Sequence, residues 1–275
     1  MALFTVFGNP ISHSLSPQIH LAFAKQLGLE LNYTRSLTSV SRFRRAVAQF
    51  FREGGAGANV TVPFKEEAYE LVTHVTARAK QAGAVNTLVP LGYGQLLGDN
   101  TDGIGLVRDL TQNLKQAIAQ RDIVLLGAGG AARGVVGPLL AEGPRQLIIA
   151  NRTLEKANAI VEVFNHRTLV AARLNEVVIP SGALVINATS ASLAHQTVAV
   201  AAEQLGQAGA VYDMMYGAEP TVFMQQARQA GVAKISDGLG MLVEQAGVAF
   251  RLWHEGAELN TQAVLGELRA QQKAR

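Results

Sequence analysis

Cysteine is absent from the 275 residues of this sequence, which excludes disulfide bonds and catalysis by a thiol. Charge is also sparse, since charged residues make up 16% of the chain against 48% hydrophobic residues, with a net charge of +3. This balance is typical of a well-packed globular enzyme and not of a disordered or fibrous chain. Lysine and arginine are scattered, and we interpret the densest basic stretch, SRFRRAV (41–47), as a solvated helix face. We therefore expect no nucleic-acid partner.

An uninterrupted membrane span is missing as well. The stretch IVLLGAGGAARGVVGPLLA (123–141) imitates one, but it carries five glycines, Arg133 and Pro138, and it begins as a strand with a glycine-rich turn. The first residues, MALFTVFGNP, have neither a basic region nor a long apolar core, so we expect no secretory signal. We expect a cytoplasmic protein without a membrane partner.

Short apolar runs alternate with amphipathic helical stretches, a pattern typical of parallel sheets with crossover helices. Because 275 residues exceed the usual size of one domain, we predict two α/β domains. We predict that residues 1–103 form one domain with a mainly parallel sheet, which the motifs below assign to substrate binding and catalysis, and that C-terminal helices in 239–275 pack back on it. Residues 104–238 form a Rossmann-type nucleotide-binding domain. The predicted strands are 3–7, 31–37, 57–62 and 85–91, then 122–127, 146–151, 168–172, 183–188, 210–215 and 233–236, with early helices at 17–27 and 40–51 and a hairpin at 91–100.

The stretch IVLLGAGGAARG (123–134) brings glycines to the turn between a strand and a helix. Gly127, Gly129 and Gly130 stand at this turn, and the helix resumes at Ala131. Such glycines let the backbone approach a pyrophosphate, whose charge lies at the helix N-terminus. A tight structural turn would also explain the glycines alone, so the interpretation depends on the strand that follows.

That strand, QLIIANRT (146–153), ends where NAD enzymes usually place the acidic residue that binds the ribose 2′-hydroxyl. Here Asn151, Arg152 and Thr153 stand instead, and Lys156 follows one helical turn later. Two cations and two neutral polar side chains suit a 2′-phosphate. The sequence therefore favours NADP(H) over NAD(H) as the cofactor.

The segment GNPISHSLSPQIH (8–20) follows the first strand. Ser16 suits the N-cap position before Pro17, and this structural role alone could explain it. Ser14 has no such explanation, and two hydroxyls beside a helix N-terminus can hold a small carboxylate. His13 and His20 have no partners at metal-ligand spacing, so we expect no metal site.

The stretch NVTVPFKEEA (59–68) is typical of a buried strand that runs into a helix. Lys65 lies in the predicted first helical turn, where a cation opposes the helix dipole at a cost of about 0.3 kcal/mol or more. Because this is a poor position for stability, we interpret Lys65 as a functional residue. GDNTDG (98–103) contains Asp99 and Asp102, and either could form an acid–base pair with Lys65, although both also suit a turn. Sequence spacing leaves the choice between them open.

Taken together, these stretches resemble the shikimate dehydrogenase family over nearly the whole chain. The matching segments are FGNPISHSLSP, GANVTVPFKEEA, AGAVNTL, GDNTDG, GAGGAARG, ANRT, INATS, YDMMY and DGLGMLVEQA. The resemblance implies NADPH-dependent reduction of 3-dehydroshikimate to shikimate, a step toward aromatic amino acids. We accordingly expect a small-molecule substrate as partner, and a monomer or a homodimer.

The resemblance also implies the residues of the site. It makes Lys65 and Asp102 catalytic, which selects Asp102 over Asp99, with the lysine stabilising charge on the ketone oxygen and donating a proton. The substrate-binding residues that it implies are Ser14, Ser16, Asn59, Thr61, Lys65, Asn86, Asp102, Tyr216 and Gln245. The cofactor-binding residues that it implies are Gly127, Ala128, Gly129, Gly130, Ala131, Asn151, Arg152, Thr153, Lys156, Thr189, Met214 and Gly238. Two alternatives stay open: a quinate/shikimate dehydrogenase of broader specificity, and a non-catalytic nucleotide-binding sensor on the same fold.

Overall fold

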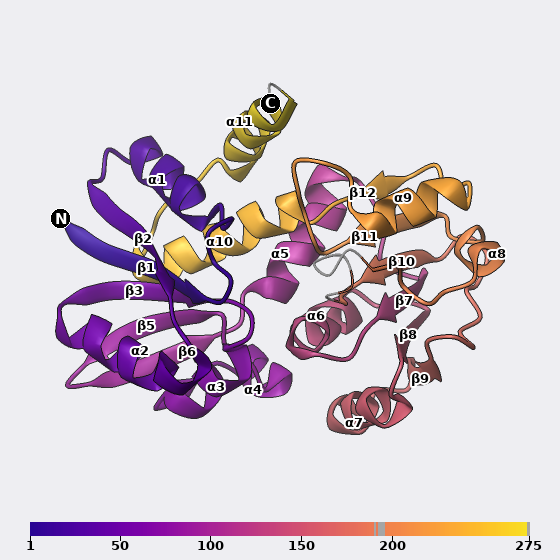
Figure 1. Ribbon diagram of the computed structural model, residues 1–275, viewed down its shortest axis with the longest axis horizontal. Coiled ribbons are helices and arrows are strands. Elements are labelled where there is room, and N and C mark those ends of the chain that lie inside the picture. Colours follow the sequence, from indigo (N-terminus) through magenta and orange to yellow (C-terminus); the bar gives the residue numbers. More distant parts are fainter. Residues whose placement is uncertain (190, 192–195, 274–275) are drawn as a thin grey trace. The chain divides into compact units, whose positions relative to one another are not determined.

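The computed structural model describes residues 1–189, 191 and 196–273, and it divides into two compact units (Figure 1). One unit contains Met1–Gly105 and Leu242–Ala270, and the other contains Leu106–Met241 together with residues 271–273. The predicted boundaries, after residues 103 and 238, lie a few residues before the observed ones, after Gly105 and Met241. Both boundaries fall inside a helix, because α5 (Asp102–Arg108) and α10 (Leu239–Trp253) each contain residues of both units. The sequence therefore shows no change of composition at either boundary.

The first unit is built on a six-stranded sheet in the order β2-β1-β3-β5-β6-β4. The β1–β2, β1–β3 and β4–β6 pairs are parallel, and the β3–β5 and β5–β6 pairs are antiparallel. The predicted hairpin is present as β5 and β6. The strands are β1 (Ala2–Gly8), β2 (Leu31–Leu37), β3 (Gly55–Val60), β4 (His74–Val75), β5 (Thr87–Gly92) and β6 (Gln95–Asp99).

Three early helices start close to their predicted positions. Helix α1 (Ser16–Gln26) begins one residue before Pro17, and Leu15 is its N-cap, so the prediction of Ser16 as N-cap was wrong. A 3-10 turn (Val40–Arg42) leads into α2 (Phe43–Arg52), and α3 (Lys65–Leu71) begins at Lys65 itself. Strand β4 and helix α4 (Ala77–Ala82) were not predicted from the sequence.

Helices cover both faces of the first sheet, because the apolar side chains along its strands point alternately to one face and to the other. Phe7 contacts Phe43 of α2 with ring centroids 5.9 Å apart, whereas Phe4, three residues earlier, contacts Trp253 of α10 at 4.9 Å. A Cβ atom on Gly57 would lie 2.4 Å from Trp253 Nε1, so the glycine lets α10 approach β3 closely. The C-terminal helices thus pack on the first unit, as predicted.

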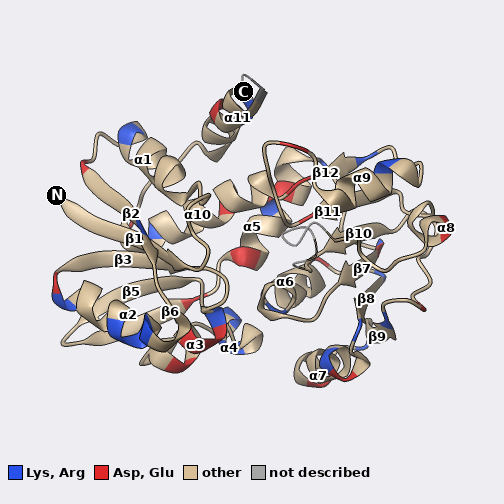
Figure 2. Ribbon diagram, in the orientation of Figure 1, with Lys and Arg blue, Asp and Glu red and all other residues tan. Residues whose placement is uncertain are grey.

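The basic stretch 41–47 lies partly on α2 beside the acidic residues of α3. Arg44 forms ion pairs with Glu67 at 3.3 Å and with Glu70 at 2.7 Å. Figure 2 shows these blue and red segments of α2 and α3 next to each other. Because Arg44 and Arg45 are both exposed, the stretch is the solvated helix face that we expected.

The second unit contains a six-stranded parallel sheet in the order β12-β11-β10-β7-β8-β9, the strand order of a Rossmann domain. Its strands are β7 (Asp122–Leu126), β8 (Gln146–Asn151), β9 (Leu169–Arg173), β10 (Leu184–Asn187), β11 (Ala210–Asp213) and β12 (Ile235–Ser236). The two-domain α/β class is confirmed.

Helices also cover both faces of the second sheet. Ile123 and Leu125 of β7 belong to a core with α6 (Gly130–Ala141) and α7 (Leu154–Phe164). Val124 and Leu126 belong to a core with α8 (Ala202–Leu205) and α9 (Val222–Gln229). A π-helical turn (Asp109–Asn113) follows α5, and α11 (Thr261–Lys273) ends the described chain. The stretch 123–141 is β7 and α6, and no helix in the described ranges is long and apolar enough to cross a membrane.

Candidate active site

An ion pair between Lys65 and Asp102 lies at the centre of the polar residues of the first unit. Lys65 Nζ is 2.6 Å from Asp102 Oδ2, with side-chain exposures of 16% for the lysine and 7% for the aspartate. Lys65 is the first residue of α3 and Asp102 the first residue of α5, where the carboxylate suits the helix dipole and the ammonium opposes it. An ammonium has three N–H donors, and the other two have no hydrogen-bond partner within the described part of the chain.

Asp99 has a different partner, which answers the question that the sequence left open. Its carboxylate accepts two hydrogen bonds from the guanidinium of Arg78, and one from the hydroxyl of Thr76 at 2.6 Å. It also accepts the backbone N–H of Asn100 at 2.8 Å and is fully buried. Asp99 therefore holds α4 and the turn after β6, while Asp102 alone of the two faces Lys65.

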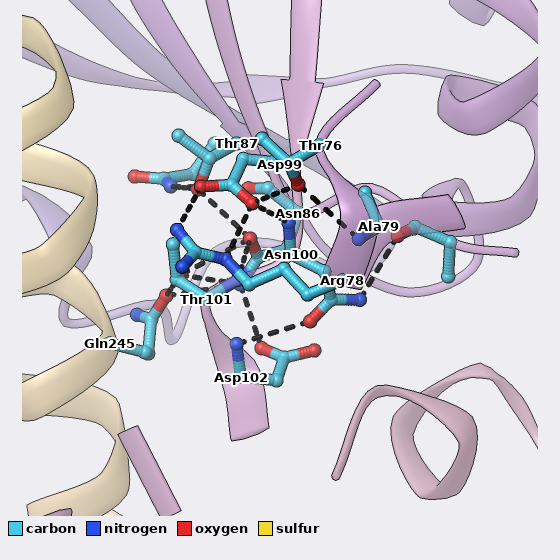
Figure 3. Close-up of polar contacts among 12 residues, drawn as sticks. Thr76, Arg78, Ala79, Asn86, Thr87, Asp99, Asn100, Thr101, Asp102 and Gln245 are labelled. Atoms are coloured by element: carbon cyan, nitrogen blue, oxygen red, sulfur yellow. Dashed lines mark hydrogen bonds and ion pairs between the residues drawn. The ribbon is translucent and has the colours of Figure 1, made fainter. Parts of the chain in front are cut away.

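Asn86 connects Asp102 to the rest of the polar group, as Figure 3 shows. Its Nδ2 donates to Asp102 Oδ1 at 2.8 Å and lies 2.9 Å from Thr101 Oγ1 and 3.2 Å from Gln245 Oε1. Its Oδ1 accepts the backbone N–H of Thr101 at 2.9 Å. Asp102 is thus fixed through one oxygen by Asn86 and through the other by Lys65. The structure brings together four of the predicted residues and adds Thr101, which was not predicted from the sequence. The four are Lys65, Asn86, Asp102 and Gln245.

Asn59 has a different surrounding from the one predicted for a substrate ligand. Its Nδ2 donates to Asn86 O and to Thr87 Oγ1, both at 3.1 Å, and its Oδ1 accepts the hydroxyl of Tyr33 at 2.6 Å and contacts His20 Nε2 at 3.1 Å. Because Asn59 is buried and each polar atom of its amide already has a protein partner, we assign it a positioning role beneath Asn86.

His20 is a further buried titratable group of this region. It stacks on Tyr33 with ring centroids 4.5 Å apart. Burial lowers the pKa of His20 from 6.5 to about 3, an effect that the hydrogen bond with Asn59 opposes and the charge of His254 reinforces. Burial also raises the pKa of Tyr33 well above its usual value. His20 is therefore a neutral core histidine, which agrees with its predicted structural role.

Ser14 and Ser16 lie together at the start of α1. Ser14 Oγ donates to Ser16 Oγ at 3.1 Å and accepts the backbone N–H of Ser16 at 3.3 Å. Ser14 therefore has a structural role at the helix start, although the sequence suggested none. The two hydroxyls are adjacent at a helix N-terminus, the arrangement predicted for a carboxylate.

The remaining predicted substrate residues differ in their surroundings. The hydroxyl of Thr61 makes no hydrogen bond within the described residues, so it is available to a ligand. Gln245 Oε1 accepts from Asn86 and from Thr101, the latter at 3.1 Å, and its Nε2 donates to Leu242 O at 3.0 Å. Tyr216 belongs to the second unit.

In the second unit, the glycine-rich turn links β7 to α6. Gly127 has φ +109°, and a Cβ there would lie 3.2 Å from the backbone of Ala188, so this position needs glycine. Apart from its immediate chain neighbours, no atom of the described residues lies within 4 Å of where a Cβ on Gly129 would stand, which leaves space beside the helix N-terminus. Gly130 is the first residue of α6, one position before the predicted Ala131.

The end of β8 carries the predicted phosphate-binding residues. Asn151 is the last residue of the strand, and its side chain donates to Thr153 O at 2.8 Å. Arg152 and Lys156 are exposed and form no ion pair with any residue that the structure describes. The parallel register places Arg173, the last residue of β9, beside Asn151. Arg173 was missed because the pairing of two strands is not visible in sequence spacing.

The predicted residues near β10 and β11 are held by a buried pair of polar side chains. Asn187 Oδ1 accepts the hydroxyl of Thr189 at 2.7 Å, and Asn187 Nδ2 donates to Asp213 Oδ1 at 3.0 Å. Met214 N donates to Asn187 O at 2.9 Å, and a Cβ on Gly238 would lie 2.2 Å from Met214 O. These contacts place the two loops at the carboxyl edge of the sheet. Ser190, the last residue of the INATS stretch, lies outside the described residues.

Comparison with known proteins shows the family of this chain. Residues 6–88 match the model of the shikimate dehydrogenase substrate binding domain, and residues 109–211 match that of shikimate / quinate 5-dehydrogenase. The shikimate dehydrogenase (NADP(+)) of Dechloromonas aromatica is 52% identical over 269 residues, which cover 98% of this chain and 97% of that protein. The Cellvibrio japonicus enzyme of the same name is 51% identical over 256 residues, 92% of each chain. The crystal structure of shikimate 5-dehydrogenase from Thermus thermophilus in complex with NADP(H) and shikimate has a TM-score of 0.85 at 33% identity and covers 98% of this chain and 99% of that one. This chain belongs to the shikimate dehydrogenase family.

Proposed function

We propose that this protein is an NADP-dependent shikimate dehydrogenase, which reversibly reduces 3-dehydroshikimate to shikimate in the route to aromatic amino acids. The observation that carries the proposal is the 2.6 Å contact between Lys65 and Asp102, with Asp102 fixed from its other oxygen by Asn86. A partly accessible ammonium with free donors, beside a positioned carboxylate, is suited to protonate the oxygen of a ketone.

Lys65 acts on the ketone oxygen. When bound, NADPH would supply the hydride for the carbonyl carbon, and negative charge would develop on the carbonyl oxygen. Lys65 directs one of its free N–H groups at that oxygen, stabilises the charge and transfers the proton that completes the alcohol. In the direction of shikimate oxidation, the lysine side chain as a neutral amine accepts the hydroxyl proton. Asp102 orients the ammonium and accepts a hydrogen bond from a neighbouring substrate hydroxyl.

The other polar side chains hold the substrate in our proposal. Ser14 and Ser16 bind the carboxylate, because their paired hydroxyls lie at the N-terminus of α1. The residues assigned to the ring hydroxyls are Thr61, Asn86, Tyr216 and Gln245. Asn59 holds Asn86 in position through a hydrogen bond to its backbone carbonyl oxygen and does not contact the substrate.

The second unit offers groups that fit NADP(H). Space beside Gly129 at the N-terminus of α6 suits the pyrophosphate, and Arg133 in the first turns of α6 has a buried Nε that lacks a partner within the described residues. Arg152 and Lys156 are proposed to bind the 2′-phosphate, with Arg173 added from the strand register. Thr189, Met214 and Gly238 lie at the loops assigned to the nicotinamide side.

Features of the chain oppose two other functions. A quinate/shikimate dehydrogenase of broader specificity would be expected to use NAD well, which the cations after β8 oppose. A non-catalytic sensor would be expected to lose Lys65 or Asp102, and both are present and paired. The cytoplasmic location and the monomeric or homodimeric state stay predictions, tested by cell fractionation and light scattering.

The test is turnover of the purified protein with two substrates and two cofactors. We expect reduction of NADP with shikimate, seen as absorbance of the reduced nicotinamide, and far lower kcat/KM with quinate or with NAD. Comparable kcat/KM for shikimate and quinate would support the broader enzyme, and binding of NADP without any turnover would support the sensor.

A further inference from the structure

Arg35 contacts the first residue of the serine pair. This residue lies on β2, and its guanidinium donates twice to the carbonyl oxygen of Ser14, from Nε at 2.8 Å and from Nη2 at 2.6 Å. The side chain is exposed, and it forms no ion pair with any residue in the described ranges. The full positive charge of Arg35 thus lies against the neutral backbone carbonyl group of Ser14.

The residues assigned to the substrate have little net charge of their own. The hydroxyls of Ser14 and Ser16 are neutral, and the charges of Lys65 and Asp102 cancel in their ion pair. The substrate, however, carries a carboxylate. Hydrogen bonds from neutral hydroxyls to a carboxylate leave its charge without a counter-ion.

The geometry points to Arg35 as the counter-charge for the substrate carboxylate. We infer that this arginine raises the affinity for carboxylate-bearing substrates and discriminates against uncharged analogues, through Ser14 and not by direct contact. The inference rests on the proposed function and deepens it, because it assigns a specificity-determining and positioning residue to the same site.

The expected size of the effect follows from covalent geometry. The guanidinium contacts Ser14 O, the substrate carboxylate would contact Ser14 Oγ, and both oxygens belong to one residue. The two charges would then be roughly 6–9 Å apart. At a partly exposed site such a pair changes an equilibrium constant by about threefold to thirtyfold, and salt reduces the effect.

The experiment compares shikimate with its methyl ester, which lacks the negative charge, in the wild type and in Arg35→Gln. We expect Arg35→Gln to raise KM for shikimate by about threefold to thirtyfold at low salt, with kcat changed by less than about threefold. The KM for the ester should change by less than about twofold. Arg35→Lys, which keeps the charge but not the planar fork, should retain most of the preference for the acid.

The matched control is Arg45→Gln on α2, because it removes one positive charge from an exposed arginine of the same unit. It should leave KM unchanged for both compounds. Raising the ionic strength should raise KM for shikimate in the wild type and have little effect in Arg35→Gln.

Equal increases in KM for the acid and the ester in Arg35→Gln would overturn the inference, since they would mean that Arg35 only anchors the Ser14 loop. An unchanged KM for shikimate would overturn it as well. Both outcomes leave the proposed function intact, because the wild type still turns over shikimate. Absence of turnover by the wild type would instead overturn the proposed function, and this inference with it.

Discussion

Removing the ammonium of Lys65 should abolish most of the catalysis while leaving the substrate site in place. We consider Lys65→Met, because methionine keeps the length of the apolar stem and lacks the charge and the donors. The change removes the ion pair with Asp102 and the two free N–H groups. Asp102 keeps its hydrogen bond from Asn86, so its position should change little.

The magnitude follows from what the ammonium supplies. A general acid contributes about 10²–10⁴-fold to the rate, which corresponds to roughly 2.7–5.4 kcal/mol of transition-state stabilisation. Loss of one donor at a developing oxyanion costs a comparable amount, roughly 10²–10³-fold. One residue supplies both effects, so they are not summed. We expect kcat to fall by about 10³-fold or more, with KM for shikimate changed by less than about fivefold.

A companion variant separates the lysine from its partner. If Asp102 works partly by orienting Lys65, then Asp102→Asn and Lys65→Met should be strongly non-additive in the double variant. Steady-state kinetics give kcat and KM, titration of shikimate gives the affinity, and thermal unfolding confirms the fold. A kcat of Lys65→Met within tenfold of the wild type would refute the catalytic assignment, and full additivity would refute the orienting role of Asp102.

Three further outcomes are expected. Ser14→Ala should weaken shikimate binding by roughly 1.5–3 kcal/mol, the cost of a lost hydrogen bond to a charged group, and equal weakening of NADP would indicate a disrupted loop instead. Arg152→Ala should raise KM for NADP by about tenfold or more, and Arg173→Ala should raise it by about threefold. The KM for NAD should not change in either variant, and Arg167→Ala is the control. Parallel increases in KM for NADP and NAD would contradict recognition of the phosphate. His20, whose pKa falls from 6.5 to about 3 on folding, stays neutral in the folded protein while the unfolded chain takes up a proton as the pH falls below 6.5. The free energy of unfolding should therefore drop by about 2 kcal/mol between pH 7 and pH 5 on account of His20, and an equal drop in His20→Gln would disprove that shift.

Most strands could be predicted because each is a short buried run between turn residues. The sequence placed β2 and β8 at their observed bounds, and it placed β3 two residues late, since the apolar pattern continues to Val62 after the pairing ends. It missed β4, which has two residues, and α4, whose start and end were visible. Thr76 caps that helix by accepting the backbone N–H of Ala79, and Gly83 ends it in the left-handed conformation.

The candidate site could be predicted only as far as single residues reveal their chemistry. Lys65 was recognisable because its position opposes the helix dipole, and the serine pair because it precedes a helix. Arg35 and Arg173 were not recognisable, because the roles that we propose for them depend on contacts between segments that are distant in the sequence. Asn59 is the opposite case, because its stretch NVTVPFKEEA was identified from the sequence but its side chain binds other protein groups and not a ligand.

The loop GDNTDG shows why sequence alone cannot separate structural from functional residues here. Asp99 binds Arg78 and Thr76, and Asn100 donates to Ala84 O at 3.0 Å, so these two side chains hold the loop against neighbouring elements (Figure 3). The next two, Thr101 and Asp102, bind Asn86 instead, and Asp102 reaches Lys65. The same residue type at two positions three apart thus serves two purposes. Asp99→Asn should mainly lower the melting temperature, because a buried carboxylate loses its charge opposite Arg78, whereas Asp102→Asn should mainly lower kcat.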